Sequence, residues 1–134
     1  MPRAVSDEVR RRVAARAGWV CEYCLLPEEH SGYPHQMDHI VSRKHGGAST
    51  EDNLALACVA CNRNKGADVA ALSTSGDPVR LFHPRRQRWL DHFLWAGPAV
   101  RPLSDVGEVT IRILRLNDLW RVKERIALRR FWLI

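Results

Sequence analysis

Two pairs of cysteines constrain this 134-residue chain more than any other feature. Cys21 and Cys24 form one C-x-x-C pair, Cys58 and Cys61 form the other, and 33 residues lie between the pairs. A two-residue gap lets one tight turn present both sulfurs to a single ion, and two such turns complete a tetrahedron. Four thiolates leave no position open for water, so we expect a closed structural site with zinc as the metal. A redox pair or four unrelated thiols is the alternative.

The expected compartment supports the metal interpretation. The sequence has no apolar stretch long enough to span a bilayer, and residues 1–8 lack the apolar core of a signal peptide. We therefore expect a cytoplasmic protein without membrane association. In that reducing environment, close cysteine pairs favour metal binding over disulfides.

The charge is positive and uneven. The chain carries a net charge of +6, with nine Lys and Arg against eight Asp and Glu in residues 1–67, and twelve against seven in residues 68–134. Such a balance favours a polyanionic partner such as nucleic acid. A basic face that only keeps the chain in solution is the alternative.

Sequence periodicity predicts mixed α and β structure in the first half. Ser6 is a suitable cap for a helix that runs to about residue 17. Alternation predicts a strand over residues 36–42, and residues 54–57 form a second short strand. The second cysteine pair should begin a helix that extends to Lys65.

The second half is predicted to be mainly helical. The sequence Ser-Thr-Ser-Gly-Asp-Pro at residues 73–78 is the best linker, which divides the chain into domains 1–72 and 79–134. A hairpin around Gly97 precedes a helix capped by Ser104, although the alternation over residues 109–113 would equally suit a strand. Residues 118–134 are expected to form a last helix.

Four short sequence motifs, two of which contain the cysteine pairs, resemble those of a known family. They are C-E-Y-C, D-H-I, D-N-L and C-V-A-C-N-R-N-K, which begin at Cys21, Asp38, Asp52 and Cys58. Each motif alone is weak evidence, but their joint order and spacing over roughly residues 10–67 resembles that of the HNH endonucleases. The resemblance implies an α+β fold: a small ββα-metal finger held by a four-cysteine zinc site, with an N-terminal helix and a mainly helical C-terminal extension.

The resemblance also implies roles for individual residues. His39 would be the general base for phosphodiester hydrolysis, and Asn53 would support the loop that orients it, although Asn53 could equally be a simple turn residue. Asp38 and Asn62 would bind one divalent cation. Asn62 stands where the family name has a histidine, and its oxygen favours Mg²⁺ or Mn²⁺. Because neighbours in a strand face opposite sides, a twist or bulge must bring Asp38 and His39 to one phosphate.

Several other residues are candidates for nucleic-acid contact. Lys65 lies one turn after Asn62 and could hold a phosphate, or could be a solvated helix lysine. His35 could contact the phosphate, or could be a plain loop histidine. Arg63 is a further candidate beside them. In the second half the candidates for backbone contact are Arg85, Arg86 and Arg88.

Aromatic residues accompany the arginines of the second half. They could stack on bases, but the commoner role is to fill a small core while the arginines face water. They are Phe82, Trp89, Phe93, Trp95, Trp120, Phe131 and Trp132.

Three functions are compatible with these features. The first is a DNA endonuclease, with RNA as an alternative substrate, acting as a monomer or homodimer. The second is a non-catalytic, zinc-stabilised module that binds nucleic acid. The third is an interaction domain held together by zinc. The Asp38, His39 and Asn62 set favours the first, because binding alone does not require a base beside oxygen ligands for a metal.

Overall fold

The computed structural model describes residues 5–130, which form two compact units. Unit 1 is Met1–Val69 and unit 2 is Ala70–Ile134. Each unit is described by itself. No helix among the described residues is long and apolar enough to cross a membrane.

Unit 1 begins with helix α1 (Asp7–Arg16), as its sequence predicts. The Ser6 hydroxyl accepts a hydrogen bond from the Val9 amide at 3.2 Å and caps the helix. At the other end, the Arg16 guanidinium donates to the backbone oxygens of Glu51 (2.8 Å) and Leu54 (2.7 Å). These bonds fasten α1 to the start of a strand far along the chain.

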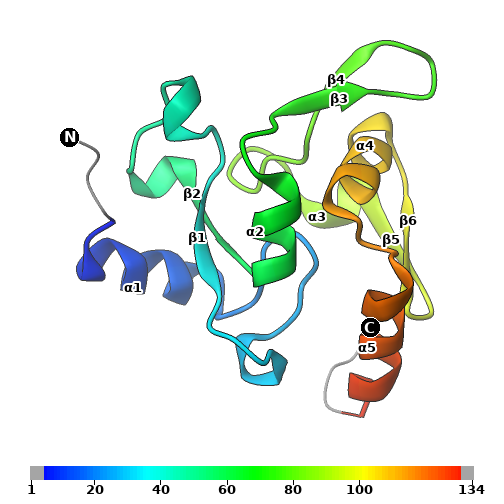
Figure 1. Cartoon of the computed structure of the whole chain (residues 1–134), viewed down its shortest axis with the longest axis horizontal. Helices are drawn as coiled ribbons and strands as arrows, with labels where there is room; N and C mark the ends of the chain where they lie inside the picture. The colour runs from blue at the N-terminus through cyan, green and yellow to red at the C-terminus, as the bar shows by residue number, and fades with distance from the viewer. Residues whose placement is uncertain (1–4, 131–134) are drawn as a thin grey trace. The chain divides into compact units, whose positions relative to one another are not determined.

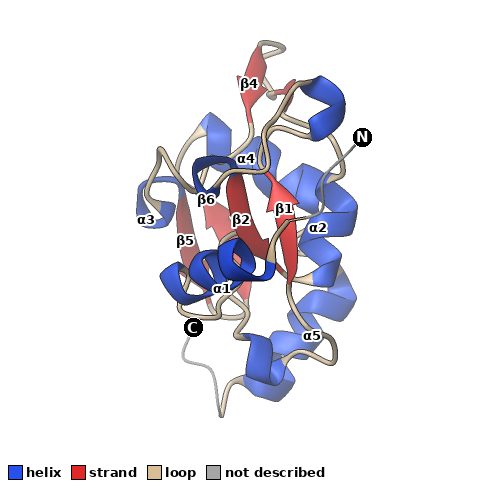
Figure 2. Ribbon diagram, turned by 90° about the vertical axis from the view of Figure 1, so that its left-hand side faces the viewer, coloured by secondary structure: helices blue, strands red, loops and turns tan. Residues whose placement is uncertain are grey.

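A two-stranded antiparallel sheet and one helix follow, and they form the ββα unit seen in Figures 1 and 2. Strand β1 (Gln36–His39) pairs with β2 (Leu54–Ala57), and helix α2 (Val59–Lys65) follows β2 directly. Short 3-10 turns lie before β1 (η1, Glu28–His30) and between the strands (η2, Arg43–His45; η3, Glu51–Asn53). This arrangement of two strands, one helix and a four-cysteine cluster is the ββα fold that the resemblance predicted.

Strand β2 forms the centre of unit 1. All four of its residues are buried, and it contacts both α1 and α2. A strand covered on two sides needs apolar residues at consecutive positions, which explains the sequence Leu-Ala-Leu-Ala. Strand β1 is shorter than predicted. The Ile40 amide still makes a ladder bond to the Asn53 carbonyl, but the Asn53 amide bonds to the Thr50 carbonyl and the Val41 amide to the Asn53 side chain, so the pairing stops there.

Unit 2 begins where a linker was expected. Strands β3 (Ala70–Leu72) and β4 (Pro78–Arg80) form an antiparallel hairpin, and residues 73–77 are its turn. The Ser73 amide bonds to the Asp77 carbonyl at 2.8 Å, and Gly76 adopts a positive φ of 90°. Ser, Gly, Asp and Pro suit tight turns as well as flexible linkers, so composition alone does not separate the two.

Two helices and a second hairpin make up most of the remainder. Strands β5 (Phe93–Ala96) and β6 (Ala99–Pro102) turn at Gly97, as predicted, and the short helix α3 (Trp89–His92) precedes them. Helix α4 (Asp105–Leu114) is capped by Ser104, which settles the ambiguity over residues 109–113 in favour of helix. Helix α5 (Leu119–Leu128) is the last described element. The end of the predicted last helix, with Phe131 and Trp132, lies outside the described residues.

The aromatic residues of unit 2 pack mainly on one another. Phe93 contacts Phe82 at 5.4 Å and Trp89 at 4.9 Å between ring centroids, and Trp89 also contacts Trp95. The expectation that they fill a small core is confirmed for Phe82 and Phe93, which are buried, whereas Trp89 and Trp95 pack at its edge and are half-buried. The expectation that the arginines face water is wrong for Arg121 and Arg125, whose side chains are buried and donate to backbone carbonyls. Trp120 remains half exposed.

Candidate metal centre and active site

The four cysteines converge on one point in unit 1. Cys21 and Cys24 lie in a turn closed by the Val20–Pro27 bridge, whereas Cys58 caps α2 and Cys61 lies in its first turn. Their sulfur atoms all lie within 4.8 Å of one another, and Cys24 Sγ and Cys58 Sγ are 3.7 Å apart. A tetrahedral zinc ion with Zn–S bonds of about 2.3 Å separates its sulfurs by about 3.8 Å. The donor set therefore fits zinc.

The surroundings of the sulfurs favour a metal over free thiols. The amides of Cys24 and Cys61 donate to Cys21 Sγ and Cys58 Sγ, each at 3.4 Å, and such bonds stabilise thiolates. Burial nevertheless raises the pKa of the Cys21 and Cys61 thiols well above the usual value. Only a cation within the cluster would let all four ionise, and four sulfurs would then leave it no open position. The site fits a structural role.

The turn between the first two cysteines carries a buried link to β1. The Tyr23 hydroxyl donates to Asp38 Oδ2 at 2.6 Å, and both side chains are buried. Burial and the neighbouring Asp38 carboxylate raise the pKa of Tyr23, which keeps the phenol protonated and able to donate. The turn of the cysteine cluster thus places a hydrogen-bond donor beside the strand that carries Asp38 and His39.

The other oxygen of Asp38 faces α2. Lys65 Nζ donates to Asp38 Oδ1 at 3.2 Å and to the carbonyls of His39 and Ile40 at 3.1 Å each. The side chains of the pair are only 2% (Lys65) and 3% (Asp38) exposed. Burial raises the pKa of Asp38, and this effect outweighs the opposing effects of Lys65 and Tyr23.

One expectation therefore needs correction. Lys65 was expected to contact phosphate or to be solvated, but it is buried and all three ammonium donors bind within the protein. Asp38 was expected as a ligand of a divalent cation, and in this structure Tyr23 and Lys65 engage both of its carboxylate oxygens. In this structure the Lys65 ammonium is the cation that neutralises Asp38, and a divalent ion at Asp38 requires that ammonium to move.

His39 lies at the end of β1 and turns to a different partner. It is half-buried, and its Nε2 lies 2.9 Å from the Ser49 hydroxyl. The ladder is regular up to the His39–Leu54 pair, so no bulge turns Asp38 and His39 toward one point. Burial lowers the pKa of His39, and the nearby Arg43 lowers it further. The imidazole is consequently neutral near pH 7.

Asn53 holds the loop that carries Ser49. Its Oδ1 accepts from the Val41 amide at 3.0 Å, and its Nδ2 donates to the carbonyls of Val41 (2.9 Å) and Ala48 (2.8 Å). Gly47 is needed in the same loop, because a Cβ there would overlap the Val41 carbonyl. Asn53 thus joins both ends of the segment that brings Ser49 to His39.

Asn62 lies on α2 opposite the start of β1. Its Nδ2 donates to Gln36 Oε1 at 2.7 Å in an exposed position. Gln36 and Asp38 share one face of β1, while Asn62 and Lys65 lie one turn apart on α2. The Asn62 and Asp38 oxygens therefore belong to the same strand–helix interface, and hard oxygen donors of this kind suit Mg²⁺ or Mn²⁺.

The remaining candidates are divided between the two units. His35 is only 6% exposed, and its Nε2 bonds to the Leu26 carbonyl at 2.8 Å, whereas Arg63 is exposed on α2. Arg86 and Arg88 are exposed in unit 2, and Arg85 is half-buried.

Comparison with known proteins agrees with the geometry. Residues 21–68 match the family model described as HNH endonuclease. Over this segment, which we call the HNH domain, the chain is similar to that family. No curated protein and no solved structure matches the chain.

The HNH domain uses residues that the sequence did not single out. Tyr23 lies within the first C-x-x-C motif, which is defined by its cysteines alone, and Ser49 lies in a polar loop. The only sequence signal for Ser49 is its place four residues before Asn53, in the loop between the two predicted strands. Neither residue type is diagnostic, so their roles emerge only from contacts.

The buried pair in the HNH domain makes a testable prediction. Lys65→Met retains apolar bulk but leaves the Asp38 carboxylate buried beside no cation, so the free energy of unfolding in urea should fall by about 3–5 kcal/mol. The double variant Asp38→Asn/Lys65→Met removes both charges and should recover much of that loss. Arg63→Met, on the exposed side of α2, is the matched control and should change it by less than about 0.5 kcal/mol. A Lys65→Met variant as stable as the wild type would contradict the buried pair.

Proposed function

We propose that this protein is a metal-dependent endonuclease that hydrolyses phosphodiester bonds in DNA, with His39 as general base. The observation that carries the proposal is a neutral, half-buried imidazole held by Ser49 within an HNH domain. A general base must be unprotonated at working pH and fixed in orientation. His39 meets both requirements.

The His39–Ser49 contact suggests which ring nitrogen reacts. If Nε2–H donates to the Ser49 oxygen, the Nδ1 lone pair is free to take a proton from water. Nδ1 has no hydrogen-bond partner among the described residues. The deprotonated water would attack phosphorus while His39 carries the proton away. Asn53, which fixes the Ser49 loop, is a positioning residue in this scheme.

The divalent cation is proposed to bind Asn62, together with Asp38 once the Lys65 ammonium has moved aside and the end of β1 has twisted to bring Asp38 and His39 to one phosphate. When bound, Mg²⁺ or Mn²⁺ would supply Lewis-acid stabilisation of charge on the phosphate and the leaving oxygen. The four-cysteine site cannot supply it, because its coordination shell would be full. Zinc and the second ion therefore have separate roles.

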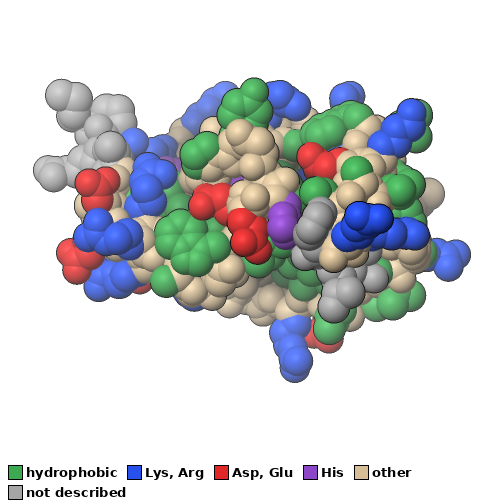
Figure 3. Space-filling model, turned by 90° about the horizontal axis from the view of Figure 1, so that it is seen from below, with side chains coloured by type: hydrophobic (Ala, Val, Ile, Leu, Met, Phe, Trp, Pro, Cys, Tyr) green, Lys and Arg blue, Asp and Glu red, His purple; other side chains and the backbone are tan. Residues whose placement is uncertain are grey.

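The nucleic-acid partner is proposed from charge and family. Lys and Arg side chains lie at many points on the face in Figure 3, with acidic side chains between several of them. We propose that Arg63, Arg86 and Arg88 add backbone contacts in DNA, with Arg85 contributing from its half-buried position. A cytoplasmic monomer or homodimer is compatible with this function.

A second candidate function is a non-catalytic, zinc-stabilised module that binds nucleic acid. One specific observation favours it: the Lys65 ammonium already neutralises the Asp38 carboxylate, so this carboxylate needs no divalent ion. The two candidates differ in whether phosphodiester bonds break when Mg²⁺ or Mn²⁺ is added.

Plasmid nicking tests the proposal. His39→Ala should lower the nicking rate in Mg²⁺ or Mn²⁺ by about 10²–10⁴-fold, because it removes the proton acceptor. The melting temperature and DNA affinity should stay close to those of the wild type. His45→Ala removes an exposed histidine from the same loop and should cleave normally. Equal cleavage by His39→Ala and wild type would refute the mechanism, and DNA binding without cleavage by the wild type would favour the second candidate.

The pH dependence of cleavage offers an independent prediction. Because the base must be neutral, the rate should rise with pH through the His39 pKa and then level off. Burial and Arg43 lower that pKa, so the midpoint should lie below the ordinary histidine value of about 6.5. Arg43→Gln removes one cause and should move the midpoint upward, whereas Lys44→Gln should move it less. A midpoint above 6.5 in the wild type, or no shift in Arg43→Gln, would argue against this account of His39.

A further inference from the structure

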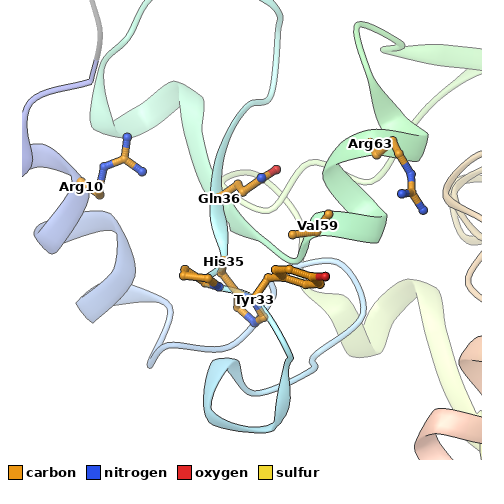
Figure 4. A pocket seen from close by; sticks show the side chains of 7 residues that line it. Arg10, Tyr33, His35, Gln36, Val59 and Arg63 are labelled. Carbon is orange, nitrogen blue, oxygen red and sulfur yellow. The ribbon is translucent and has the colours of Figure 1, made fainter.

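A cavity of about 580 Å³ opens beside β1, α1 and α2 in unit 1 (Figure 4). We propose that it holds one unstacked nucleotide of a single-stranded segment of DNA, beside the cleavage site. The proposal rests on the proposed function and names the form of substrate that this site takes. Its volume lies within the range of about 300–1,000 Å³ that small-molecule sites usually have.

Two cations line the cavity without a carboxylate among its described lining residues. Arg10 comes from α1 and Arg63 from α2, and both side chains are exposed. Neither guanidinium has an ion pair or hydrogen bond with another described residue. Two uncompensated guanidiniums around one hollow suit the phosphates on either side of a nucleotide.

Tyr33 supplies an aromatic surface at the same cavity. It is 71% exposed, and its phenol makes no hydrogen bond to a described residue. Figure 4 shows the ring among the lining side chains, between the α1 and α2 walls. An exposed ring next to cations is the arrangement that stacks on unpaired bases.

His35 gives the cavity an unmatched polar atom. Its side chain is more than nine-tenths buried, and its Nε2 must donate to the Leu26 carbonyl because that oxygen can only accept. Its Nδ1 is buried and has no hydrogen-bond partner among the described residues. A buried nitrogen without a partner is costly. A small shift of the side chains that cover this nitrogen would let a base amino group or sugar hydroxyl in the cavity donate to it.

The cavity adjoins the proposed cleavage site through Gln36. This side chain lines the cavity and accepts a hydrogen bond from Asn62. His39 lies three residues further along β1, about 10 Å away for an extended strand, and its side chain leaves the opposite face of the strand from Gln36. Because a stacked and paired base cannot enter a cavity, a single-stranded segment is the form that fits.

Binding without cleavage tests the subsite. Fluorescence anisotropy would measure the affinity of the zinc-loaded full chain, in a His39→Ala background without added Mg²⁺ or Mn²⁺, for a labelled 12-nucleotide single strand and its duplex. We expect tighter binding to the single strand, and a loss of about tenfold or more in Tyr33→Ala. Tyr33→Phe should restore the affinity, because stacking needs only the ring. Arg10→Gln and Arg63→Gln should each weaken binding and reduce the salt slope by about 1, whereas Arg11→Gln should do neither.

The outcomes separate this proposal from the nuclease. Single-strand affinity that is unchanged in Tyr33→Ala and in the Arg10 and Arg63 variants overturns the subsite, even if the wild type nicks plasmid. Affinity that depends on Tyr33, in a wild-type chain that never nicks plasmid with Mg²⁺ or Mn²⁺, supports the subsite and refutes the nuclease. A preference for duplex over single strand also overturns the inference.

Discussion

The structure of unit 1 depends on the closure of four sulfurs around one point. Cys21 and Cys24 precede β1, whereas Cys58 and Cys61 begin α2, so an ion shared by the four sulfurs would tie the two ends of the ββα unit together. Closing so long a loop restricts the unfolded chain, and metal binding then contributes directly to folding. A unit of about 69 residues buries only a modest apolar core, so such a cross-link adds substantially to its stability.

The closure also determines what each face of β1 can do. On one face, Tyr23 and Lys65 enclose the Asp38 carboxylate, and these hydrogen bonds fix that side of the strand to the cysteine turn and to α2. His39 turns instead toward Ser49, in a loop that Asn53 holds at both ends. In this structure, therefore, the Asp38 carboxylate is enclosed by its partners, whereas the imidazole of the next residue, His39, is half-buried.

The parts of the fold and of the metal site that depend on neighbouring residues could be predicted from the sequence. The thiol spacing, the serine caps of α1 and α4, and the apolar run of β2 each depend on nearby residues. Burial of Lys65 could not be predicted, because it depends on carbonyls at residues 39 and 40 that only the fold brings near. The contact of Ser49 with His39 could not be predicted either, because the fold brings the two together. The turn at residues 73–77 could not be told from a linker, because its composition suits both. Arg121 and Arg125 are buried because backbone carbonyls accept their protons, which no helical pattern reveals.

The most direct test of this account is the metal coordination of the purified chain. Metal analysis and X-ray absorption at the zinc edge would give the stoichiometry and the ligand shell. We expect one zinc per chain with four sulfur ligands at about 2.3 Å, and loss of the folded HNH domain when a chelator removes it. A shell that contains nitrogen or oxygen, or a metal-free chain with an unchanged melting curve, would contradict the claim that thiolate-bound zinc holds the site together.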